Sequence, residues 1–375
     1  MKKIYVSRHE HGYLTALAEN GKLLEVILDD DKNASIVGNI YAGIVKKINT
    51  GFIFLDIGLT KQAFLDTRDH RERGLFENGK LAVKHGDTLI VQILRDSTGD
   101  KGPVATSNIS HVGPFVVLAK SVEHDKISIS KKITDSAEAA RLKAIGEKLV
   151  PTGFSAIMRS AAKNRREDEI ALEILAVAEK FNEINGQYVK GPAALLTEPP
   201  IIKTLREIAG DDIDEIVVDD NATYALLADY GPRLRFYNEC QPIFERFFLK
   251  TQIDKIRDKR VWLKSGAFIV IERTEACVVI DVNSGKLTAK KGDAALKVNM
   301  EAAKEIAYQL RLRNLSGIII VDFIAIKSPD DTHSLTELLR TEMAKDRIPA
   351  VVVGLTALGL MEITRKRLRP PVKIK

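Results

Sequence analysis

The chain has 375 residues, 45% of them hydrophobic, which is typical of a globular protein with two or more domains. No apolar run reaches the roughly 18 residues of a membrane-spanning helix, and residues 1–10 contain no secretory hydrophobic region. We therefore expect a cytoplasmic protein without a transmembrane segment. The 57 basic and 51 acidic side chains give a net charge of +6, which weakly favours a polyanionic partner.

The sequence contains no pattern typical of a disulfide framework, of a zinc site or of a nucleotide-binding loop. Cys240 and Cys277 lie singly in unrelated contexts and match neither a disulfide framework nor a zinc pattern, so we expect reduced thiols with structural roles. The seven histidines show no ligand spacing. The chain also contains no GxxxxGK[ST] loop and no GxGxxG after a strand, which argues against a nucleotide-using enzyme.

The first hundred residues have the pattern of β-structure. Residues 1–35 are predicted to form a strand pair, KKIYVSR and KLLEVILDD, joined by a polar turn and too small to fold alone. Residues 36–108 contain short β-runs punctuated by Gly, Asn and Asp: GNIYAGIVKKI, GFIFLDIG, QAFLD and DTLIVQILRD. A series of this length predicts a small barrel of the OB type.

The middle of the chain is mixed. Over residues 109–190 the pattern predicts a strand pair at 113–118 and 126–131, a helix at 136–149, a strand at 153–159 and a helix at 166–184. Over residues 191–262 it predicts a helix near 201–209, strands at EIVVDD (215–220) and LRFYN, and a polar helix near 241–258. From residue 261 strands and helices alternate up to a basic stretch.

Two apolar β-branched runs each end on an aspartate. These are ACVVIDVNSG (276–285), with Asp281, and GIIIVDFIAI (317–326), with Asp322. An ionised carboxylate is costly beside a buried strand unless it lies at the strand's exit and meets a cation, so both are candidate metal ligands. The alternative is that each aspartate only caps a loop.

The spacing between the two runs predicts one shared site. Apolar residues recur at helical intervals over 294–315, which indicates a strand, helix, strand crossover with both carboxylates at one sheet edge. Asn283 adds a neutral donor and acceptor, and oxygen ligands without His or Cys favour magnesium or manganese. Asp219 and Asp220, which end EIVVDD, lack an evident partner strand and such an asparagine, so we expect them to be structural.

The barrel strands place aromatic residues on unusual faces. In GFIFLDIG, period two sends Ile53, Leu55 and Ile57 to one face and Phe52, Phe54 and Asp56 to the other, and in QAFLD Phe64 shares a side with Gln62. Stacking on nucleobases, at roughly 1–3 kcal/mol per base, would explain Phe54 and Phe64. Cover by a neighbouring domain is the alternative. Lys101, in the loop GDKGP, either contacts phosphate or solvates a turn.

Together these segments resemble the catalytic half of the ribonuclease E/G family, bacterial endoribonucleases that cut single-stranded RNA. The most specific motifs are IDVNSG at 280–285, EAAKEIAYQLRLRNLSG at 301–317, IIIVDFI at 318–324 and LGLMEITRKRLRP at 358–370. GNIYAGIV followed by FLDIGLTKQAFL resembles the family's S1 domain, an OB barrel. The resemblance extends over nearly the whole chain.

The resemblance implies an α+β multidomain fold. Residues 1–35 and 191–262 would form an RNase H-like subdomain, with an inserted S1 (OB-fold) RNA-binding domain at 36–108 and a 5′-sensor subdomain at 109–190. Residues 263–375 would form a DNase I-like catalytic subdomain.

The resemblance also implies roles for individual residues. Asp281 and Asp322 would hold a catalytic Mg²⁺, with Mn²⁺ as a substitute, and Asn283 would orient the site and the scissile phosphate. Phe54, Phe64 and Lys101 would contact RNA. A pocket for the 5′-monophosphate of the substrate would be formed by four further residues: Gly113, Val117, Arg159 and Ser160. A guanidinium fork with a hydroxyl suits a terminal phosphate dianion.

Two departures from the family pattern alter these expectations. Ala357, in TALGLMEI, stands where better-known members carry an arginine that supports the 5′-phosphate pocket. The sequence stops at Lys375, without the CPxCxG-type zinc-link, as a naturally short form or a truncated one. We therefore expect no zinc site in this chain, and a homo-oligomer would have to form without a zinc-link.

The predicted function is a magnesium-dependent endoribonuclease acting on single-stranded RNA in RNA processing and decay. The family implies AU-rich substrates, a preference for 5′-monophosphorylated RNA, and products with 5′-phosphate and 3′-hydroxyl ends. A basic loop near the metal would neutralise the RNA backbone or is only solvated: Lys286, Lys290 and Lys291. The alternative is a non-catalytic S1-domain RNA-binding scaffold or regulator. The intact acids argue against it, because carboxylates repel phosphate unless a cation intervenes.

Overall fold

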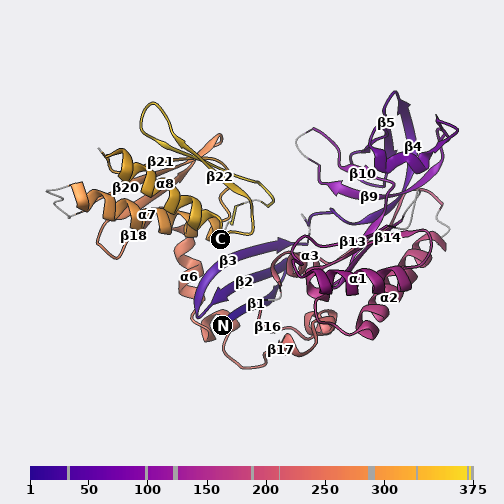
Figure 1. Cartoon of the computed structure of the whole chain (residues 1–375), viewed down its shortest axis with the longest axis horizontal. Helices are drawn as coiled ribbons and strands as arrows, with labels where there is room; N and C mark the ends of the chain where they lie inside the picture. The colour runs from indigo at the N-terminus through magenta and orange to yellow at the C-terminus, as the bar shows by residue number, and fades with distance from the viewer. Residues whose placement is uncertain are drawn as a thin grey trace. The chain divides into compact units, whose positions relative to one another are not determined.

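The computed structural model describes residues 1–31, 34–97, 100–120, 126–186, 190–210, 212–285, 292–326, 328–369 and 371–372. The chain divides into two compact units, and the second is inserted into the sequence of the first (Figure 1). Unit 1 comprises Met1–Lys32 and Asp212–Lys375, and unit 2 comprises Asn33–Asp211. No helix among the described residues is long and apolar enough to cross a membrane.

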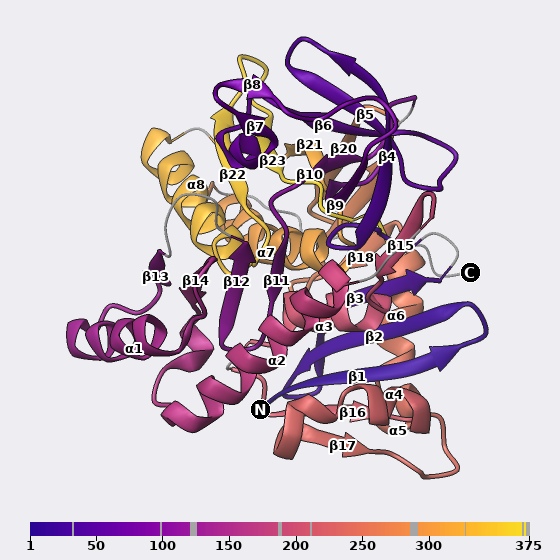
Figure 2. The ribbon, with the colours of Figure 1, turned by 90° about the vertical axis from the view of Figure 1, so that its right-hand side faces the viewer.

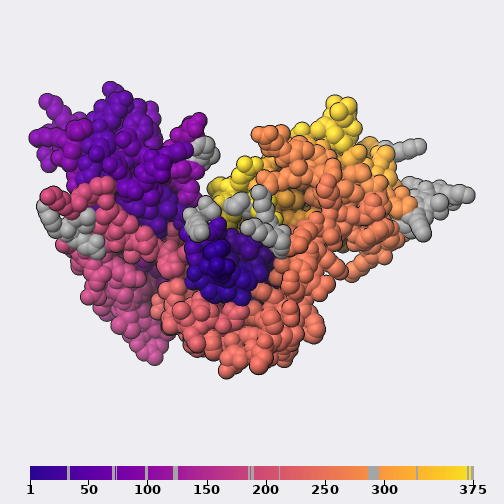
Figure 3. All heavy atoms as spheres, turned by 180° about the vertical axis from the view of Figure 1, so that it is seen from behind, coloured from indigo at the N-terminus to yellow at the C-terminus, as the bar shows by residue number. Residues whose placement is uncertain are grey.

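Unit 1 contains a five-stranded sheet built from both ends of its sequence. The strands are β1 (Lys2–His9), β2 (Gly12–Glu19), β3 (Lys22–Asp30), β16 (Glu215–Val218) and β17 (Leu234–Phe236), in the order β17-β16-β1-β2-β3. Figure 3 shows the indigo N-terminal strands against the salmon residues that follow Asp212. The predicted strand pair was wrong, because residues 12–19 form a strand rather than a turn. Six of its eight residues are buried, so it lacks the alternation that marks a half-exposed strand.

The expectation for Asp219 and Asp220 needs correction in one respect. The strand that ends on Asp219 and Asp220 does have partners, since β16 pairs in parallel with both β1 and β17. Asp220 has a structural role, because it caps helix α4 (Asn221–Leu226) by accepting a 2.7 Å hydrogen bond from the Thr223 amide. Hydrogen bonds from the Thr223 hydroxyl and amide lower the pKa of Asp220.

The polar helix predicted near 241–258 is broken into short pieces. These are α5 (Ile243–Arg246), α6 (Lys250–Asp254) and the 3₁₀ turn η4 (Lys255–Arg257), preceded in the chain by η3 (Ala228–Arg233). Phe248 lies between α5 and α6 with φ of +58°, a left-handed conformation that ends a helix. A phenylalanine in that conformation has no local sequence signal.

The second sheet of unit 1 carries the paired aspartates. Its order is β18-β19-β20-β21-β23-β22. The strands are β18 (Arg260–Trp262), β19 (Phe268–Arg273), β20 (Cys277–Asn283), β21 (Gly317–Asp322), β22 (Ala350–Leu355) and β23 (Met361–Arg365). Helices α7 (Gly292–Leu312) and α8 (Pro329–Met343) pack on one face (Figure 1). β20, α7 and β21 form the predicted crossover, because β20 and β21 are parallel neighbours.

Unit 2 contains the predicted barrel. Its strands are β4 (Ile40–Asn49), β5 (Phe52–Asp56), β6 (Ala63–Asp66), β9 (Thr88–Arg95) and β10 (Val104–Thr106). The pairing runs β4-β5-β6-β10-β9 and returns from β9 to β4, which closes the five strands. The insertion between β6 and β9 holds η1 (His70–Leu75), β7 (Phe76–Glu77) and β8 (Lys80–Leu81). The OB-type prediction is confirmed.

Unit 2 also contains a four-stranded sheet, which is covered by helices α1 (Ser136–Leu149) and α2 (Glu167–Gly186) (Figure 2). Its strands are β11 (Ser110–Val112), β12 (Val116–Lys120), β13 (Ile127–Ile129) and β14 (Phe154–Met158), in the order β11-β12-β14-β13. The predicted pairing of the first two segments was therefore wrong, because β14 inserts between β12 and β13. Unit 2 also contains η2 (Ser160–Ala162), β15 (Ala193–Leu196) and α3 (Pro200–Ile208).

Candidate functional site

The two aspartates lie side by side on neighbouring strands. In the parallel ladder of β20 and β21, Asp281 is directly opposite Asp322. Both side chains are exposed. Adjacent strands are about 4.8 Å apart, so the carboxylates leave the same face of the sheet close together. The structure thus brings together the two residues that the sequence pattern singled out.

The alternation of β20 explains why the carboxylates face away from the helices. Val278, Ile280 and Val282 are buried in the core with α7, so the residues between them point to the opposite face. Asp281 and Asn283 are on this opposite face. The Asn283 Nδ2 donates a 2.6 Å hydrogen bond to Asp281 Oδ2, which fixes one carboxylate oxygen.

A buried amide anchors the segment that follows Asp322. Asn299 of α7 is fully buried, and its Nδ2 donates to the Ile324 carbonyl oxygen at 2.7 Å while its Oδ1 accepts from the Ile324 amide at 3.0 Å. This pair of hydrogen bonds ties the exit of β21 to the helix. The sequence prediction missed Asn299, although it lies at helical spacing from the apolar residues Leu296 and Ala303.

The donor set around the aspartates fits a hard divalent cation. Two carboxylates and one amide supply only oxygen ligands, which magnesium and manganese prefer and which differ from the nitrogen and sulfur ligands of structural zinc sites. No group of three or more His, Cys, Asp or Glu side chains that would hold a metal occurs among the described residues. Neither Asp281 nor Asp322 forms an ion pair with any other described residue, so their paired negative charge is not offset by protein cations there.

The barrel presents a group of three aromatic rings. Phe54 lies opposite Phe64 in the ladder of β5 and β6, with ring centroids 5.9 Å apart, and Phe52 is 5.5 Å from each. Ile53 and Leu55 are buried on the other face, which confirms the predicted division of β5. All three rings are half-buried. The sequence prediction noted the face of Phe52 but gave this ring no role.

Lys101 is exposed and lies just before β10. Its neighbour Gly102 runs against the start of β6, because a Cβ at Gly102 would lie 2.0 Å from the Gln62 carbonyl oxygen. The Phe64 amide donates to the Pro103 carbonyl at 2.8 Å, which continues this contact along the chain. The backbone at Lys101 is therefore held near the strand that carries Phe64.

Arg159 holds the loop at Gly113. Its Nη1 donates to the carbonyl oxygens of Gly113, at 2.6 Å, and Pro114, at 3.2 Å. Ser160 begins the 3₁₀ turn directly after Arg159, and Val117 lies opposite Ile157 in the ladder of β12 and β14. Gly113, Arg159 and Ser160 are thus close together at one end of this sheet.

A carboxylate that the sequence prediction missed occupies the other side of this loop. Glu173 of α2 accepts hydrogen bonds from the Phe115 amide, at 2.8 and 3.0 Å, and from the Val116 amide, at 2.8 Å. A Cβ at Gly113 would lie 2.2 Å from Glu173 Oε1, so only glycine leaves room for this carboxylate. The loop is held between Arg159 on its carbonyls and Glu173 on its amides.

The other predicted positions contribute less. Lys286, Lys290 and Lys291 lie outside the described residues. Ala357 is exposed in the turn between β22 and β23.

Comparison with known proteins decides the family. Residues 110–368 match the model of the Ribonuclease E/G family. Ribonuclease G of Escherichia coli (strain K12) is 33% identical over 389 residues, which cover 96% of this chain and 78% of the relative. The chain belongs to the ribonuclease E/G family. The resemblance read from its motifs is confirmed.

Two further relatives agree. Ribonuclease G of Haemophilus influenzae is 32% identical over 380 residues, which cover 94% of this chain and 77% of the relative. Ribonuclease E of Nostoc sp. is 31% identical over 388 residues, which cover 94% of this chain and 55% of the relative. The ribonuclease E/G family model includes both strands that carry the paired aspartates.

Proposed function

We propose that this member of the ribonuclease E/G family is an endoribonuclease that cleaves single-stranded RNA in RNA processing and decay, in the cytoplasm. Family membership supports the reaction class. The observation that carries the proposal is the register that sets Asp281 opposite Asp322 on one exposed sheet face. Two unpaired carboxylates facing a polyanion repel it unless a cation lies between them.

Asp281 and Asp322 would hold the divalent metal, Mg²⁺ with Mn²⁺ as a substitute. Such a metal, when bound, polarises a phosphoryl oxygen and lowers the pKa of a coordinated water. Asn283 donates a hydrogen bond to Asp281 Oδ2 and so would orient the carboxylate that holds the metal. Asn299 keeps Asp322 in place by tying the end of its strand to α7.

The aromatic group of the barrel would hold single-stranded RNA. Phe52, Phe54 and Phe64 offer half-exposed rings within 6 Å of one another, on the face opposite the barrel core. Every base has a π-face, so such a platform binds sequence-tolerantly at about 1–3 kcal/mol per stacked base. Lys101 would add a phosphate contact from the neighbouring strand.

Gly113, Val117, Arg159 and Ser160 would recognise a 5′-monophosphate. The Arg159 guanidinium and the Ser160 hydroxyl are adjacent donors at the loop. Two features limit the preference for this terminus: Ala357 supplies no positive charge, and the Glu173 carboxylate lies on the loop's amides. Cleavage would leave 5′-phosphate and 3′-hydroxyl ends, as in a hydrolysis by metal-bound water.

We assign the subdomains on the same basis. Within unit 2, residues 36–108 would be the S1 domain and 109–190 the 5′-sensor. An RNase H-like subdomain would comprise residues 1–35 and 191–262, most of which belong to unit 1. The DNase I-like catalytic subdomain would comprise residues 263–375, also in unit 1.

The test is cleavage of a 5′-monophosphorylated single-stranded RNA of mixed sequence, with magnesium, with manganese and with EDTA. We expect metal-dependent cutting, with ends that a 5′-phosphate-dependent exonuclease and a 3′-end ligase identify. Tight RNA binding without cutting under either metal would instead support the scaffold alternative. That alternative keeps the aromatic platform and makes Asp281 and Asp322 structural.

A further inference from the structure

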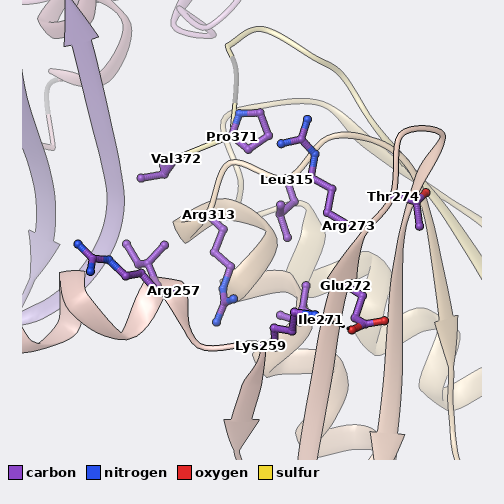
Figure 4. A pocket seen from close by; sticks show the side chains of 11 residues that line it. Arg257, Lys259, Ile271, Glu272, Arg273, Thr274, Arg313, Leu315, Pro371 and Val372 are labelled. Atoms are coloured by element: carbon purple, nitrogen blue, oxygen red, sulfur yellow. Dashed lines mark hydrogen bonds and ion pairs between the residues drawn. The ribbon is translucent and has the colours of Figure 1, made fainter. Parts of the chain in front are cut away.

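A second candidate binding site lies in unit 1, away from the paired aspartates. It is a cavity of about 420 Å³ between η4, the end of β19, the turn after α7 and residues 371–372 (Figure 4). In the ladder of β19 and β20, the lining residues Ile271 and Arg273 lie opposite Ile280 and Val278, which face the core, whereas Asp281 is on the other face of the sheet. We call it the arginine cavity, after three of its lining residues: Arg257, Arg273 and Arg313.

Arg313 is a buried cation without a carboxylate partner. Arg313 is only 7% exposed. Its Nε donates to Gln309 Oε1 at 2.6 Å and its Nη1 to the Asp258 carbonyl oxygen at 2.7 Å, both neutral acceptors. Among the described residues no carboxylate forms an ion pair with it, and burial lowers its pKa. Buried charges in proteins are normally paired directly, whereas the carboxylates of Asp258 and Glu305 act on this guanidinium only at longer range.

The rim adds more unpaired positive charge. Arg257 and Arg273 are exposed, and neither forms an ion pair with a described residue. Lys259 pairs with Glu272 at 2.9 Å, which is the carboxylate of the lining. Four cationic side chains and one carboxylate give the lining a net charge of +3. Like charges gathered around one hollow repel one another unless an anion offsets them.

The wall behind these cations is apolar. Ile256, Ile271 and Leu315 line it and are each less than a tenth exposed. Small-molecule sites typically measure about 300–1,000 Å³ and combine an apolar lining with a few fixed polar groups. Guanidinium forks match phosphate oxygens, and the apolar wall would accept a ring. The lining therefore favours an organic phosphate over a bare inorganic anion.

We propose that the arginine cavity binds a nucleoside phosphate, either a free mononucleotide or one nucleotide of an RNA chain. Arg313 supplies a buried charge at the back, and Arg257 and Arg273 hold the phosphate from the rim. The site is separate from Asp281 and Asp322, so it does not depend on the proposed cleavage reaction. It would act as a second contact point for RNA or as a sensor of free nucleotide.

Calorimetric titration of the full chain with AMP tests the proposal, with adenosine as the uncharged probe. We expect AMP to bind and adenosine not to, and the Arg257→Ala/Arg273→Ala double variant to bind AMP at least about tenfold more weakly. Arg340→Ala, at an exposed arginine of α8 paired with Glu337, is the matched control and should bind as the wild type does. All these titrations use the Arg159→Ala background, which removes the proposed 5′-phosphate pocket as a second site for AMP.

Several results would overturn the proposal. They are an absence of AMP binding in the Arg159→Ala background, equal binding when the two rim substitutions are added, or a loss that Arg340→Ala reproduces. Because both rim side chains are exposed, the double variant should fold, and an unchanged unfolding temperature would show it. Arg273→Glu provides a second test, because reversing the charge should weaken AMP binding more than the alanine does.

A second arm distinguishes the two sources of the nucleotide. A fluorescent RNA oligonucleotide is titrated in EDTA against Asp281→Asn and against Asp281→Asn combined with the two rim substitutions. If the cavity takes a nucleotide of RNA, the combined variant binds the oligonucleotide more weakly and AMP displaces RNA from Asp281→Asn. If it takes free nucleotide, AMP binding is lost in the combined variant while the affinity for RNA is unchanged.

Discussion

Replacing Glu173 by alanine should loosen the loop that begins at Gly113. The carboxylate accepts hydrogen bonds from the amides of Phe115 and Val116, at 2.8 Å for the shorter contacts. A hydrogen bond to a charged group contributes about 1.5–3 kcal/mol, and Glu173 is half-buried, which favours the low end. We expect the free energy of unfolding to fall by about 2–3 kcal/mol in Glu173→Ala and by about 1 kcal/mol in Glu173→Gln, which keeps an acceptor oxygen.

Gly113→Ala provides the partner substitution for a double-mutant cycle. Its Cβ would lie 2.2 Å from Glu173 Oε1, so it must displace the same carboxylate. The two substitutions should therefore be non-additive, with Gly113→Ala costing clearly less when Glu173 is already alanine. Urea unfolding of the four proteins measures the coupling.

The same variants connect the loop to substrate choice. If the loop must be ordered to form the proposed 5′-phosphate pocket, Glu173→Ala should reduce the ratio of kcat/KM for 5′-monophosphorylated over 5′-hydroxylated RNA. Additive losses of stability, or a cost below about 0.5 kcal/mol for Glu173→Ala, would refute the reasoning, since surface substitutions fall in that range.

Three further predictions concern other parts of the chain. Phe54→Ala combined with Phe64→Ala should weaken single-stranded RNA binding by about 2–5 kcal/mol in fluorescence anisotropy at fixed salt, and an unchanged affinity would favour a purely structural role for the rings. Arg347→Ala should destabilise unit 1 by about 2 kcal/mol in urea unfolding, because Glu25, only 4% exposed, would keep only its longer ion pair with Arg311, and a cost below about 0.5 kcal/mol would contradict this. Burial lowers the pKa of His111 to about 4, so the folded state stays neutral while the unfolded chain takes up a proton below pH 6.5. Stability is therefore lost as the pH falls from about 6.5 toward 4, by about 2 kcal/mol at pH 5, and His111→Gln should remove this part of the pH dependence.

The sequence was most informative where a physical constraint acts locally. The β-branched runs before Asp281 and Asp322, with a helix between them, predict a right-handed crossover connection. Such a crossover places the ends of both strands at the same edge of the sheet. The alternation in β5 likewise identified the buried and aromatic faces of the barrel. In both cases burial on one side of a strand dictates the order of residue types.

The features that could not be predicted depend on contacts between distant segments. Glu173 and Asn299 act through hydrogen bonds to the backbone of other elements, and the sequence of their own helices does not show which backbone groups they meet. The insertion of β14 between β12 and β13 is a matter of strand order, which local propensity does not encode. The break at Phe248 requires a left-handed residue that the surrounding fold imposes.

The central claim is that Asp281 and Asp322 work as one metal site. Single-turnover cleavage of RNA at saturating magnesium should be measured for the wild type, Asp281→Asn, Asp322→Asn and the double variant, with Asp219→Asn as the matched strand-end control. We predict a large loss in each single variant, no further loss in the double, normal rates in the control and retained RNA binding in all. A single variant that keeps wild-type cleavage, or losses that multiply in the double variant, would contradict the shared site.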